Sequence, residues 1–182
     1  MRIVRTSIPS LLVIEPKVYC DDRGSFFESF NQKVFSELLG EDIQFVQDNQ
    51  SISFKNVLRG MHYQIKQPQG KLVRVIRGSI YDVAVDLRTG SSNFGEYAGI
   101  HLSAENKRQL WIPEGFAHGF LTTTEVAEVA YKTTDYYAPE YERCISWNDP
   151  AIGVDWGELS GKPVLSEKDS KGVALGDAEL FS

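Results

Sequence analysis

The sequence has few cysteines, no internal repeats and no long apolar run. Its 182 residues contain only Cys20 and Cys144, which lie far apart and form no C-x-x-C motif. This pattern predicts reduced, unpaired thiols and a cytoplasmic location. The amino-terminal stretch has a basic start but neither a sustained apolar segment nor a small-residue cleavage site. We therefore expect no signal peptide and no membrane-spanning helix.

Positive charge is also scarce. Lysine and arginine total 19 against 25 aspartates and glutamates, which gives a formal net charge of -6. Non-specific binding to nucleic acid or to an anionic membrane surface is therefore not expected. A local cluster of arginine and lysine can still bind an anionic ligand. The hydrophobic content of 42% is ordinary for a globular chain, and the length fits a single domain over residues 1–182.

Helix signals are equally sparse. The clearest one begins at Asn31 as N-cap, continues as an apolar stripe through residues 32–39 and ends at Gly40. A doubly wound fold needs crossover helices, for which the sequence has no room. Residues from about 43 to 147 have strand patterns instead. The sequence predicts an all-β sandwich or barrel with short peripheral helices.

The predicted strands are short and are separated by glycine, proline or asparagine. They cover residues 71–76, 80–87, 96–102, 109–112, 116–122, 127–134 and 143–147. The first two, joined by a turn at Gly78, are predicted to form a hairpin. In the strand 127–134, period-two alternation places Tyr131 on the apolar, inward face with Val129. A small barrel of this kind can hold one small ligand.

Two histidines stand in distinctive segments. In RGMHYQ, Arg59 and His62 are three residues apart, so a regular strand would point them to opposite faces. A bulge at Gly60 would turn both toward one cavity, although an exposed arginine and a core histidine are the commoner arrangement. PEGFAH delivers His118 onto a strand between two aromatic residues. The sequence has no H-x-H pair and gives these separated histidines no partner carboxylate, so no metal site is expected.

Basic and acidic groups supply further candidates. Arg23 lies in a D-D-R-G turn, and Lys71 follows a glycine at the start of an apolar strand. A bidentate arginine suits a phosphate, but each such charge alone is usually a solvated surface group. In SEKD, Ser166 and Asp169 can cap a short helix. Asp169 can equally orient a histidine in an acid–base site, and the spacing leaves both interpretations open.

Segments spanning about residues 15–170 together resemble the dTDP-sugar epimerase family of the cupin superfamily. The resemblance implies a cupin-type jelly-roll fold. It also implies epimerisation of dTDP-4-dehydro-6-deoxy-D-glucose at C3 and C5, without a metal or other cofactor. The matching segments, in chain order, are DDRGSFFESF, FVQDNQSIS, VLRGMHYQ, QGKLVRV, YDVAVDLR, SAENKRQLWIPEGFAHGF, AYKTTDYY, ISWNDP and LSEKD.

The resemblance also implies roles for individual residues. His62 would be the base, paired with Asp169, while Tyr131 would be the acid on the other side of the sugar and Lys71 would lie near the ketone. The N-terminal segment, about residues 1–50, would be lent across a homodimer interface, and residues 150–182 would form a C-terminal extension. The positions that match nucleotide or sugar binding are Arg23, Glu28, Gln47, Asn49, Arg59, Lys71, His118, Glu142 and Lys168.

The implied chemistry is consistent with this set of groups. C3 and C5 both flank the C4 ketone, so removal of either proton leaves an enolate that a fixed cation such as Lys71 can stabilise. Histidine is suited to proton abstraction near neutral pH. No electron leaves the sugar, and the sequence has no G-x-G-x-x-G loop for a nicotinamide. The alternatives are an epimerase acting at one carbon only, a metal-dependent cupin oxygenase and a catalytically silent sugar-nucleotide binder.

The sequence departs from the family pattern at three places. Met61 replaces a commoner leucine, and Gly157 stands where proline is frequent. Asn56 replaces a frequent glycine, which disfavours a positive φ angle at that position. None of the three coincides with the acid, the base or the lysine.

Overall fold

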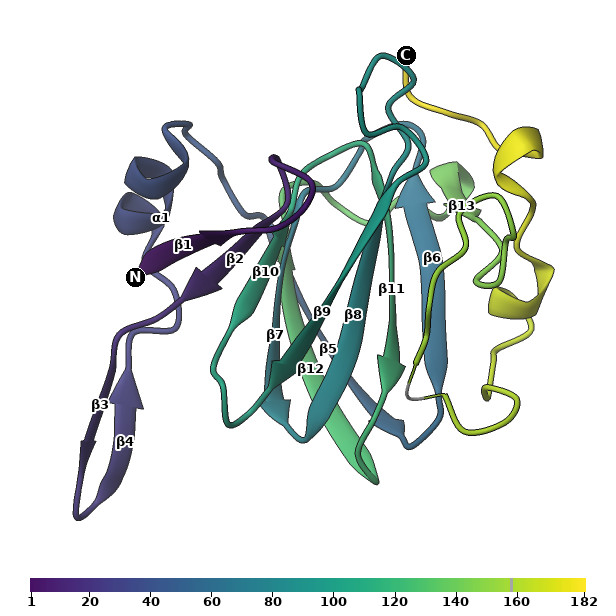
Figure 1. Cartoon of the computed structure of the whole chain (residues 1–182). Coiled ribbons are helices and arrows are strands. Elements are labelled where there is room, and N and C mark those ends of the chain that lie inside the picture. Colours follow the sequence, from purple (N-terminus) through teal and green to yellow (C-terminus); the bar gives the residue numbers. More distant parts are fainter. Residues whose placement is uncertain (158) are drawn as a thin grey trace.

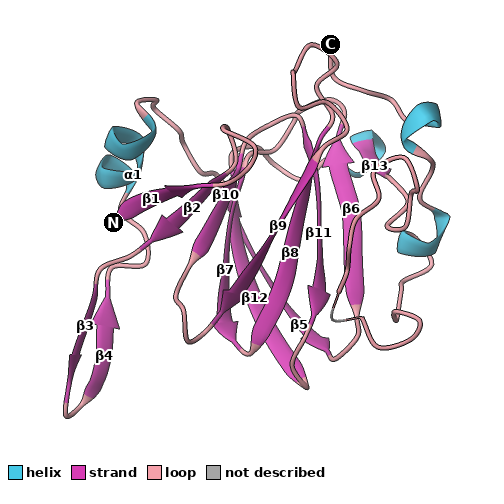
Figure 2. Ribbon diagram, viewed as in Figure 1, coloured by secondary structure: helices cyan, strands magenta, loops and turns pink. Residues whose placement is uncertain are grey.

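Two antiparallel β-sheets stacked face to face form the body of the protein (Figure 1). The computed structural model describes residues 1–157 and 159–182. Figure 2 shows that helices lie only at the periphery of the sheets. The predicted all-β jelly roll with short peripheral helices is confirmed. Among the described residues, no helix is long and apolar enough to cross a membrane.

The larger sheet has six strands in the order β1-β2-β10-β7-β12-β5. Its central strands β7 and β12 pair so that Val73 lies opposite Tyr131 and Lys71 opposite Thr133. The strand bounds are β1 Arg2–Arg5, β2 Leu12–Glu15, β5 Gln47–Phe54, β7 Lys71–Arg77, β10 Gln109–Ile112 and β12 Val126–Thr133.

The smaller sheet has five strands in the order β13-β6-β11-β8-β9. A separate two-stranded hairpin, β3–β4, extends away from the body (Figure 1). The bounds are β6 Leu58–Gln64, β8 Ser79–Asp86, β9 Tyr97–Ser103, β11 Phe116–Thr122, β13 Glu142–Cys144, β3 Val18–Asp21 and β4 Gly24–Phe27. The described residues also include three 3₁₀ turns, of which the first precedes β13 and the other two follow it: η1 Pro139–Tyr141, η2 Asp169–Lys171 and η3 Leu175–Asp177.

Alternation along the strands divides the apolar residues into three clusters. Between the sheets, inward residues such as Val73, Val129 and Phe120 form the main core. The outer face of the smaller sheet is covered by the C-terminal segment, in which Trp156 is buried. The outer face of the larger sheet is only partly covered, by a third cluster around Phe35.

The helix α1, Gln32–Leu39, has the predicted bounds. The side chain of Asn31 accepts a hydrogen bond from the backbone N–H of Val34 at 3.2 Å, and Gly40 ends the helix with a φ of 73°. Phe35 is fully buried and meets the Trp111 ring edge-on at a centroid distance of 5.4 Å. Burial of this ring therefore holds α1 against the sheet, together with Leu39 of the same cluster.

The predicted hairpin of residues 71–76 and 80–87 is wrong. Strands β7 and β8 belong to different sheets, and the connection at Gly78, with a φ of 74°, carries the chain across the thickness of the sandwich. Nearly every residue of β8 is buried, so both its faces are covered. Its sequence therefore contains no signal that distinguishes pairing with β7 from crossing to the opposite sheet.

Other differences are smaller. The last predicted strand, 143–147, is instead Glu142–Cys144, because Ile145 forms an isolated parallel bridge with Val173. The strands of the first 30 residues were not predicted. Asn56 adopts a φ of 66° despite having a side chain, and its amide donates hydrogen bonds to the carbonyls of Ser160 and Lys162. Asparagine tolerates this conformation better than other side chains do.

We predict that Phe35→Ala lowers the free energy of unfolding by about 3 to 5 kcal/mol, because it removes a fully buried ring from the cluster that joins the helix to the sheet. Chemical denaturation at fixed protein concentration measures this change. Lys33→Ala, on the exposed face of the same helix, should leave stability within about 0.5 kcal/mol of the parent. Equal losses in the two variants would contradict this account of how α1 is held.

Candidate active site

A cavity of about 520 Å³ opens between the inner faces of the two sheets. Strands β5, β7 and β12 of the larger sheet form one wall, and β6 and β11 of the smaller sheet form the other. The predicted site residues that line it are Gln47, Asn49, Arg59, His62, Lys71, His118, Tyr131, Glu142, Lys168 and Asp169. Residues from widely separated parts of the sequence therefore meet in one place.

The predicted irregularity in β6 brings Arg59 and His62 to the same wall. On β11, His118 and Phe120 are two residues apart, yet their partners on β6 are His62 and Arg59, which are three apart. The extra residue on β6 is a β-bulge, and the side chains that follow it in β6 point to the opposite face from the one a regular strand would give them. Gly60 has a φ of 128° and its Cα lies against Gly119, so a side chain has no room there.

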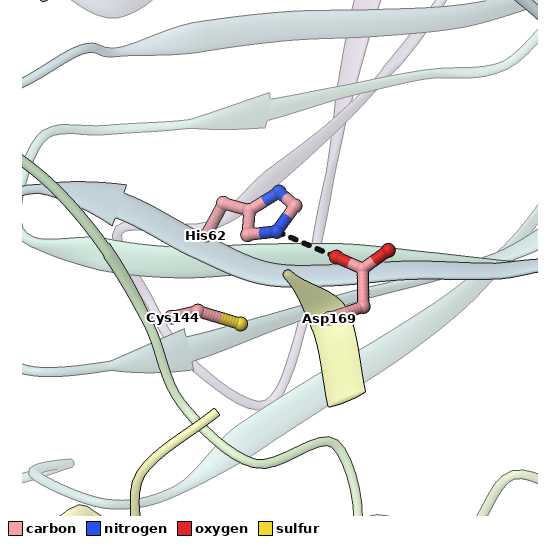
Figure 3. A group of neighbouring side chains, drawn as sticks. All are labelled: His62, Cys144 and Asp169. Carbon is pink, nitrogen blue, oxygen red and sulfur yellow. Dashed lines mark ion pairs between the residues drawn. The ribbon is translucent and has the colours of Figure 1, made fainter. Parts of the chain in front are cut away.

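His62 and Asp169 form the central contact of the site (Figure 3). The Nε2 atom of His62 lies 2.7 Å from Oδ1 of Asp169, and their side chains are 25% and 5% exposed. Asp169 comes from the turn η2 in the C-terminal segment, so the pair joins the carboxyl end of the chain to the middle of the smaller sheet.

The surroundings of Asp169 keep it ionised. Burial by itself raises the pKa of Asp169, but the contact with His62 and the hydrogen bonds from Ser166 and Gly60 outweigh it and lower the pKa to about 2. The Ser166 hydroxyl donates to Oδ2 at 2.7 Å, and the Asp169 N–H donates back to that hydroxyl at 3.1 Å. The same aspartate therefore closes a local turn and contacts a histidine.

The ionised carboxylate also sets the form of the imidazole. A nitrogen so close to a carboxylate oxygen carries the hydrogen, which places it on Nε2 of His62. In the neutral ring the lone pair is then on Nδ1. His62 can therefore accept a proton at Nδ1 while Asp169 stabilises the cation that results.

Lys71 reaches the same cavity from the opposite sheet. It is only 8% exposed, and its Nζ donates to the backbone carbonyl of His62 at 3.4 Å. Burial lowers the pKa of Lys71 to about 8, although the negative charges of Asp82 and Glu142 act in the other direction. Near neutral pH this amine is mostly an ammonium ion, and it is the buried cation closest to His62.

Tyr131 occupies the wall opposite His62, as alternation along β12 predicted. Its ring packs against the main core, and its side chain lines the cavity. Burial raises the pKa of the Tyr131 phenol, while the nearby Arg59 partly lowers it. The phenol is therefore protonated at neutral pH and can act as a hydrogen-bond or proton donor.

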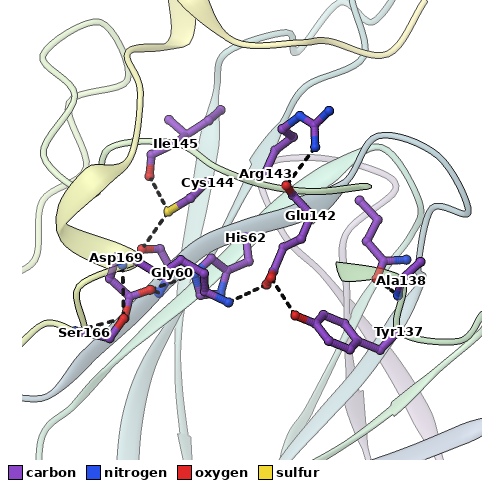
Figure 4. Close-up of polar contacts among 12 residues, drawn as sticks. Gly60, His62, Tyr137, Ala138, Glu142, Arg143, Cys144, Ile145, Ser166 and Asp169 are labelled. Carbon is purple, nitrogen blue, oxygen red and sulfur yellow. Dashed lines mark hydrogen bonds and ion pairs between the residues drawn. The ribbon is translucent and has the colours of Figure 1, made fainter. Parts of the chain in front are cut away.

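Glu142 organises the rim of the cavity next to His62 (Figure 4). It accepts a hydrogen bond from the Tyr137 hydroxyl at 2.8 Å and one from the Lys168 amine at 2.7 Å. Burial alone would raise the pKa of Glu142, but these two donors and the neighbouring His62 hold it below its usual value. Tyr137, which also lines the cavity, was not predicted as a site residue.

A second buried histidine–carboxylate pair lies beside the first. His118 is opposite His62 across β6 and β11, and its Nε2 is 2.6 Å from Oδ1 of Asp82. The expectation that these histidines are separate and lack partner carboxylates is therefore wrong. Asp82 is fully buried on β8 between Ile80 and Ala84 of the core face. An aspartate at an apolar position of a buried strand was the sequence signal that could have identified it.

Strand β5 supplies amide side chains to the rim. Gln47 donates to Asn49 at 2.9 Å and accepts from the backbone N–H of Tyr137 at 3.0 Å. Arg23 and Glu28 lie elsewhere. Arg23 is at the tip of the β3–β4 hairpin with its side chain 88% exposed and paired with Asp21, and Glu28 accepts a hydrogen bond from Asn31. Within a single chain these two predicted residues do not line the cavity.

Cys144 lies against the His62–Asp169 pair (Figure 3). It pairs with His62 across β13 and β6, and donor atoms of all three residues lie within 4.8 Å of one another. Burial raises the pKa of the Cys144 thiol to about 11, and the charge of Asp169 adds to this shift. At neutral pH the group is thus a protonated thiol beside an imidazole–carboxylate pair.

Comparison with known proteins identifies the family. The family model described as dTDP-4-dehydrorhamnose 3,5-epimerase matches residues 5–177. The chain belongs to this epimerase family. A relative named dTDP-4-dehydrorhamnose 3,5-epimerase from Pseudomonas aeruginosa is 58% identical over 181 residues, which cover 100% of this chain and 99% of that protein.

Solved structures of the epimerase family have the same fold. The Legionella pneumophila 3,5-epimerase, crystallised with dTDP-4-keto-L-rhamnose, is 52% identical with a TM-score of 0.95, and the match covers 98% of this chain and 94% of that one. A 3'-monoepimerase from Streptomyces bikiniensis, crystallised with dTDP-quinovose, is 32% identical with a TM-score of 0.89 over 97% and 88%. Proteins named for epimerisation at two carbons and at one carbon therefore share this architecture.

We predict that the Asp169 contact stabilises the fold in a pH-dependent way. Because its pKa falls from 3.8 to about 2 on folding, the stabilisation of about 2 kcal/mol is present above about pH 4 and is lost as the pH falls to about 2. The gap in unfolding free energy between the parent and Asp169→Asn should narrow over that interval. Asp177→Asn, at an exposed carboxylate of the same segment, should show no such change. A constant gap would rule out the ion pair as its source.

Proposed function

We propose that the chain epimerises dTDP-4-dehydro-6-deoxy-D-glucose at C3 and C5, giving dTDP-4-dehydro-L-rhamnose. The observation that carries this proposal is the arrangement of three groups in one cavity. His62, supported by Asp169, lies on one wall, Tyr131 lies on the other, and Lys71 extends from the wall of Tyr131 to the backbone carbonyl of His62. The family match and the substrate-related ligand of the Legionella structure support the same conclusion.

In the proposed reaction, Nδ1 of His62 removes the proton from a carbon next to the C4 ketone. The imidazolium that forms is stabilised by Asp169, whose low pKa keeps its negative charge in place. Because Asp169 is held by Ser166 and Gly60, it also fixes the direction of the imidazole ring. The base thus needs no rearrangement to receive the proton.

The enolate left on the sugar places negative charge on the C4 oxygen. The Lys71 ammonium is the group that would stabilise it, since the cation is buried and already oriented by the carbonyl of His62. Its pKa of about 8 means that the charge is present at neutral pH and that a proton could be released at low cost. Both properties suit an oxygen whose charge grows and then disappears.

Inversion requires that the proton returns to the opposite face of the carbon. Tyr131 projects from β12 in the larger sheet, whereas His62 projects from β6 in the smaller one. The raised pKa of Tyr131 keeps the phenol protonated until the enolate demands the proton. One group can therefore remove a proton from one face of the carbon while the group on the facing wall delivers a proton to the other face. The same pair can invert both C3 and C5 if the sugar ring turns.

The remaining groups of the cavity suit a nucleotide-linked sugar. Arg59 and Lys168 bring positive charge to the rim, where a diphosphate would lie. Arg59 is held in place by a hydrogen bond to Ser53 at 2.9 Å. Gln47 and Asn49 offer amide donors and acceptors that match hydroxyl or base edges.

The direct test is proton exchange in deuterated water. Incubation with dTDP-4-dehydro-6-deoxy-D-glucose, followed by NMR, should show deuterium at both C3 and C5 of the product. Label at one carbon alone would identify a single-site epimerase, as in the Streptomyces relative. Stoichiometric iron together with turnover that chelators abolish would indicate an oxygenase instead.

The same assay tests the base. His62→Ala should lower turnover by at least about a hundredfold while binding of dTDP largely survives, because the ring supplies the proton-transfer step. His101→Ala is the matched control, since His101 is exposed on β9 and does not line the cavity. Comparable rates for His62→Ala and the parent would remove His62 from the role of base, and a lack of turnover in the parent would refute the proposed substrate.

We also propose that the active form is a homodimer in which residues 1–50 complete the partner's site. The β3–β4 hairpin projects from the body and exposes Tyr19 and Phe26, which are 55% and 72% accessible. The outer face of the larger sheet exposes Ile52 and Phe54 at 60% and 69%. Large exposed apolar surfaces of this kind are typical of protein interfaces. Arg23 does not line the cavity of its own chain, and the hairpin of a partner subunit would supply an Arg23 to that cavity.

Subunit mixing tests this exchange. Arg23→Ala and His62→Ala should each be defective alone, but a mixed dimer should regain one intact site, with His62 from one chain and Arg23 from the other. Exchanged subunits should therefore recover a substantial part of the activity that both homodimers lack. No recovery from a confirmed mixed dimer would mean that Arg23 serves its own chain or neither site.

A cytoplasmic location completes the proposal. Cys20 is exposed and Cys144 is half-buried, and both are free cysteines. Free thiols of this kind persist where glutathione and thioredoxin keep proteins reduced.

A further inference from the structure

We propose that His62, Cys144 and Asp169 form an inhibitory binding site for a borderline-soft divalent cation such as Zn²⁺. The three residues come from β6, β13 and the turn η2, and their donor atoms lie within 4.8 Å of one another. Within residues 1–157 and 159–182, these three form the one group of histidine, cysteine or acidic side chains in which three or more donor atoms lie this close together. Nitrogen, sulfur and carboxylate oxygen are the donor types that zinc prefers.

The geometry needs little adjustment to hold an ion. Zinc bonds are about 2.0 to 2.3 Å long, so the donors of a tetrahedral site stand roughly 3 to 4 Å apart. Cys144 lies directly opposite His62 in the β13–β6 pair, so its side chain lies beside the His62–Asp169 pair (Figure 3). The gap between His62 and Asp169, now 2.7 Å, would open by less than a bond length to admit the ion.

A second observation points to the same place. The Nε2 atom of His62 is buried and makes no hydrogen bond of ordinary geometry, although a carboxylate oxygen lies beside it. The thiol of Cys144 is held only by weak contacts to the carbonyls of Gly60 and Ile145, both at 3.6 Å. The thiol is therefore weakly engaged, and Nε2 of His62 lies close to Asp169 without hydrogen-bond geometry, so a cation between the three donors would engage both.

Protons must leave when the ion binds. Asp169 is already ionised, but the Cys144 thiol is protonated because burial raises its pKa to about 11. Binding releases the thiol proton to solvent, and the neutral imidazole moves its single N–H hydrogen from Nε2 to Nδ1, which frees the Nε2 lone pair for the ion. This cost makes the site weaker than a structural zinc site and leaves it empty until the metal concentration rises.

Inhibition then follows from the proposed function, on which this readout rests. The bound ion would remove the His62–Asp169 pair from proton transfer, since Nδ1 would carry the hydrogen and could accept no other. Cys144 has no role in the proposed reaction, so Cys144→Ser should leave basal turnover unchanged. The cysteine is therefore the one ligand whose replacement separates metal binding from catalysis.

The binding test uses cobalt chloride and needs no substrate. Cobalt added to the full-length protein under reducing conditions should produce a thiolate-to-cobalt charge-transfer band and the visible bands of tetrahedral coordination. Both should be present in Cys20→Ser, the matched control at the exposed cysteine, and absent in Cys144→Ser. The same band in Cys144→Ser, or no band in the parent, would overturn the proposal regardless of what the enzyme turns over.

The inhibition test uses zinc chloride in the exchange assay. Zinc should inhibit the parent and Cys20→Ser at the same concentration, with recovery on addition of EDTA, which excludes oxidation as the cause. Cys144→Ser should need at least about tenfold more zinc for the same inhibition, because one of three ligands is lost. Equal sensitivity of the parent and Cys144→Ser would place any inhibitory ion elsewhere on the protein.

Discussion

The contact between His62 and Asp169 is the constraint on which the site depends, because the chain must satisfy two distant conditions to make it. Strand β6 must bulge at Gly60 so that His62 faces the cavity, and the C-terminal segment must cross the outer face of the smaller sheet to deliver Asp169. The Gly60 N–H itself donates to Asp169, so the bulge and the carboxylate position one another. A change in either element would turn the His62 imidazole away from the cavity.

The second constraint is the polar lining of an otherwise apolar sandwich. Buried charges are costly unless they are paired, and here they are grouped so that each has a counterpart. Asp82 contacts His118 and attracts Lys71, while Lys71 also donates to the backbone of His62. The apolar residues above and below this layer give the protein its stability, and the layer itself leaves room for a ligand.

Much of the architecture could be predicted from the sequence, because strand alternation and helix capping are local signals. Tyr131 was placed inward by period two alone, and Asn31 and Gly40 bounded the helix. The pairing of β7 could not be predicted, since strands buried on both faces have no preferred partner in the local pattern. Asp169 could be assigned only by resemblance, because its own neighbourhood indicates no more than a helix cap.

The two histidine–carboxylate pairs show how burial determines what a similar contact can do. His118 and Asp82 are 10% and 0% exposed, so their pair is buried in the wall of the cavity and is suited to holding a fixed shape or charge. His62 is 25% exposed and has one nitrogen against Asp169 and the other available to the cavity. An imidazole that exchanges protons with a ligand must combine a fixed side with an open one, and of these two histidines His62 satisfies both conditions. The buried nitrogen on the fixed side is also the one that the proposed inhibitory cation would share with Asp169 and the neighbouring thiol, so the proposed reactivity and the proposed inhibition depend on one arrangement.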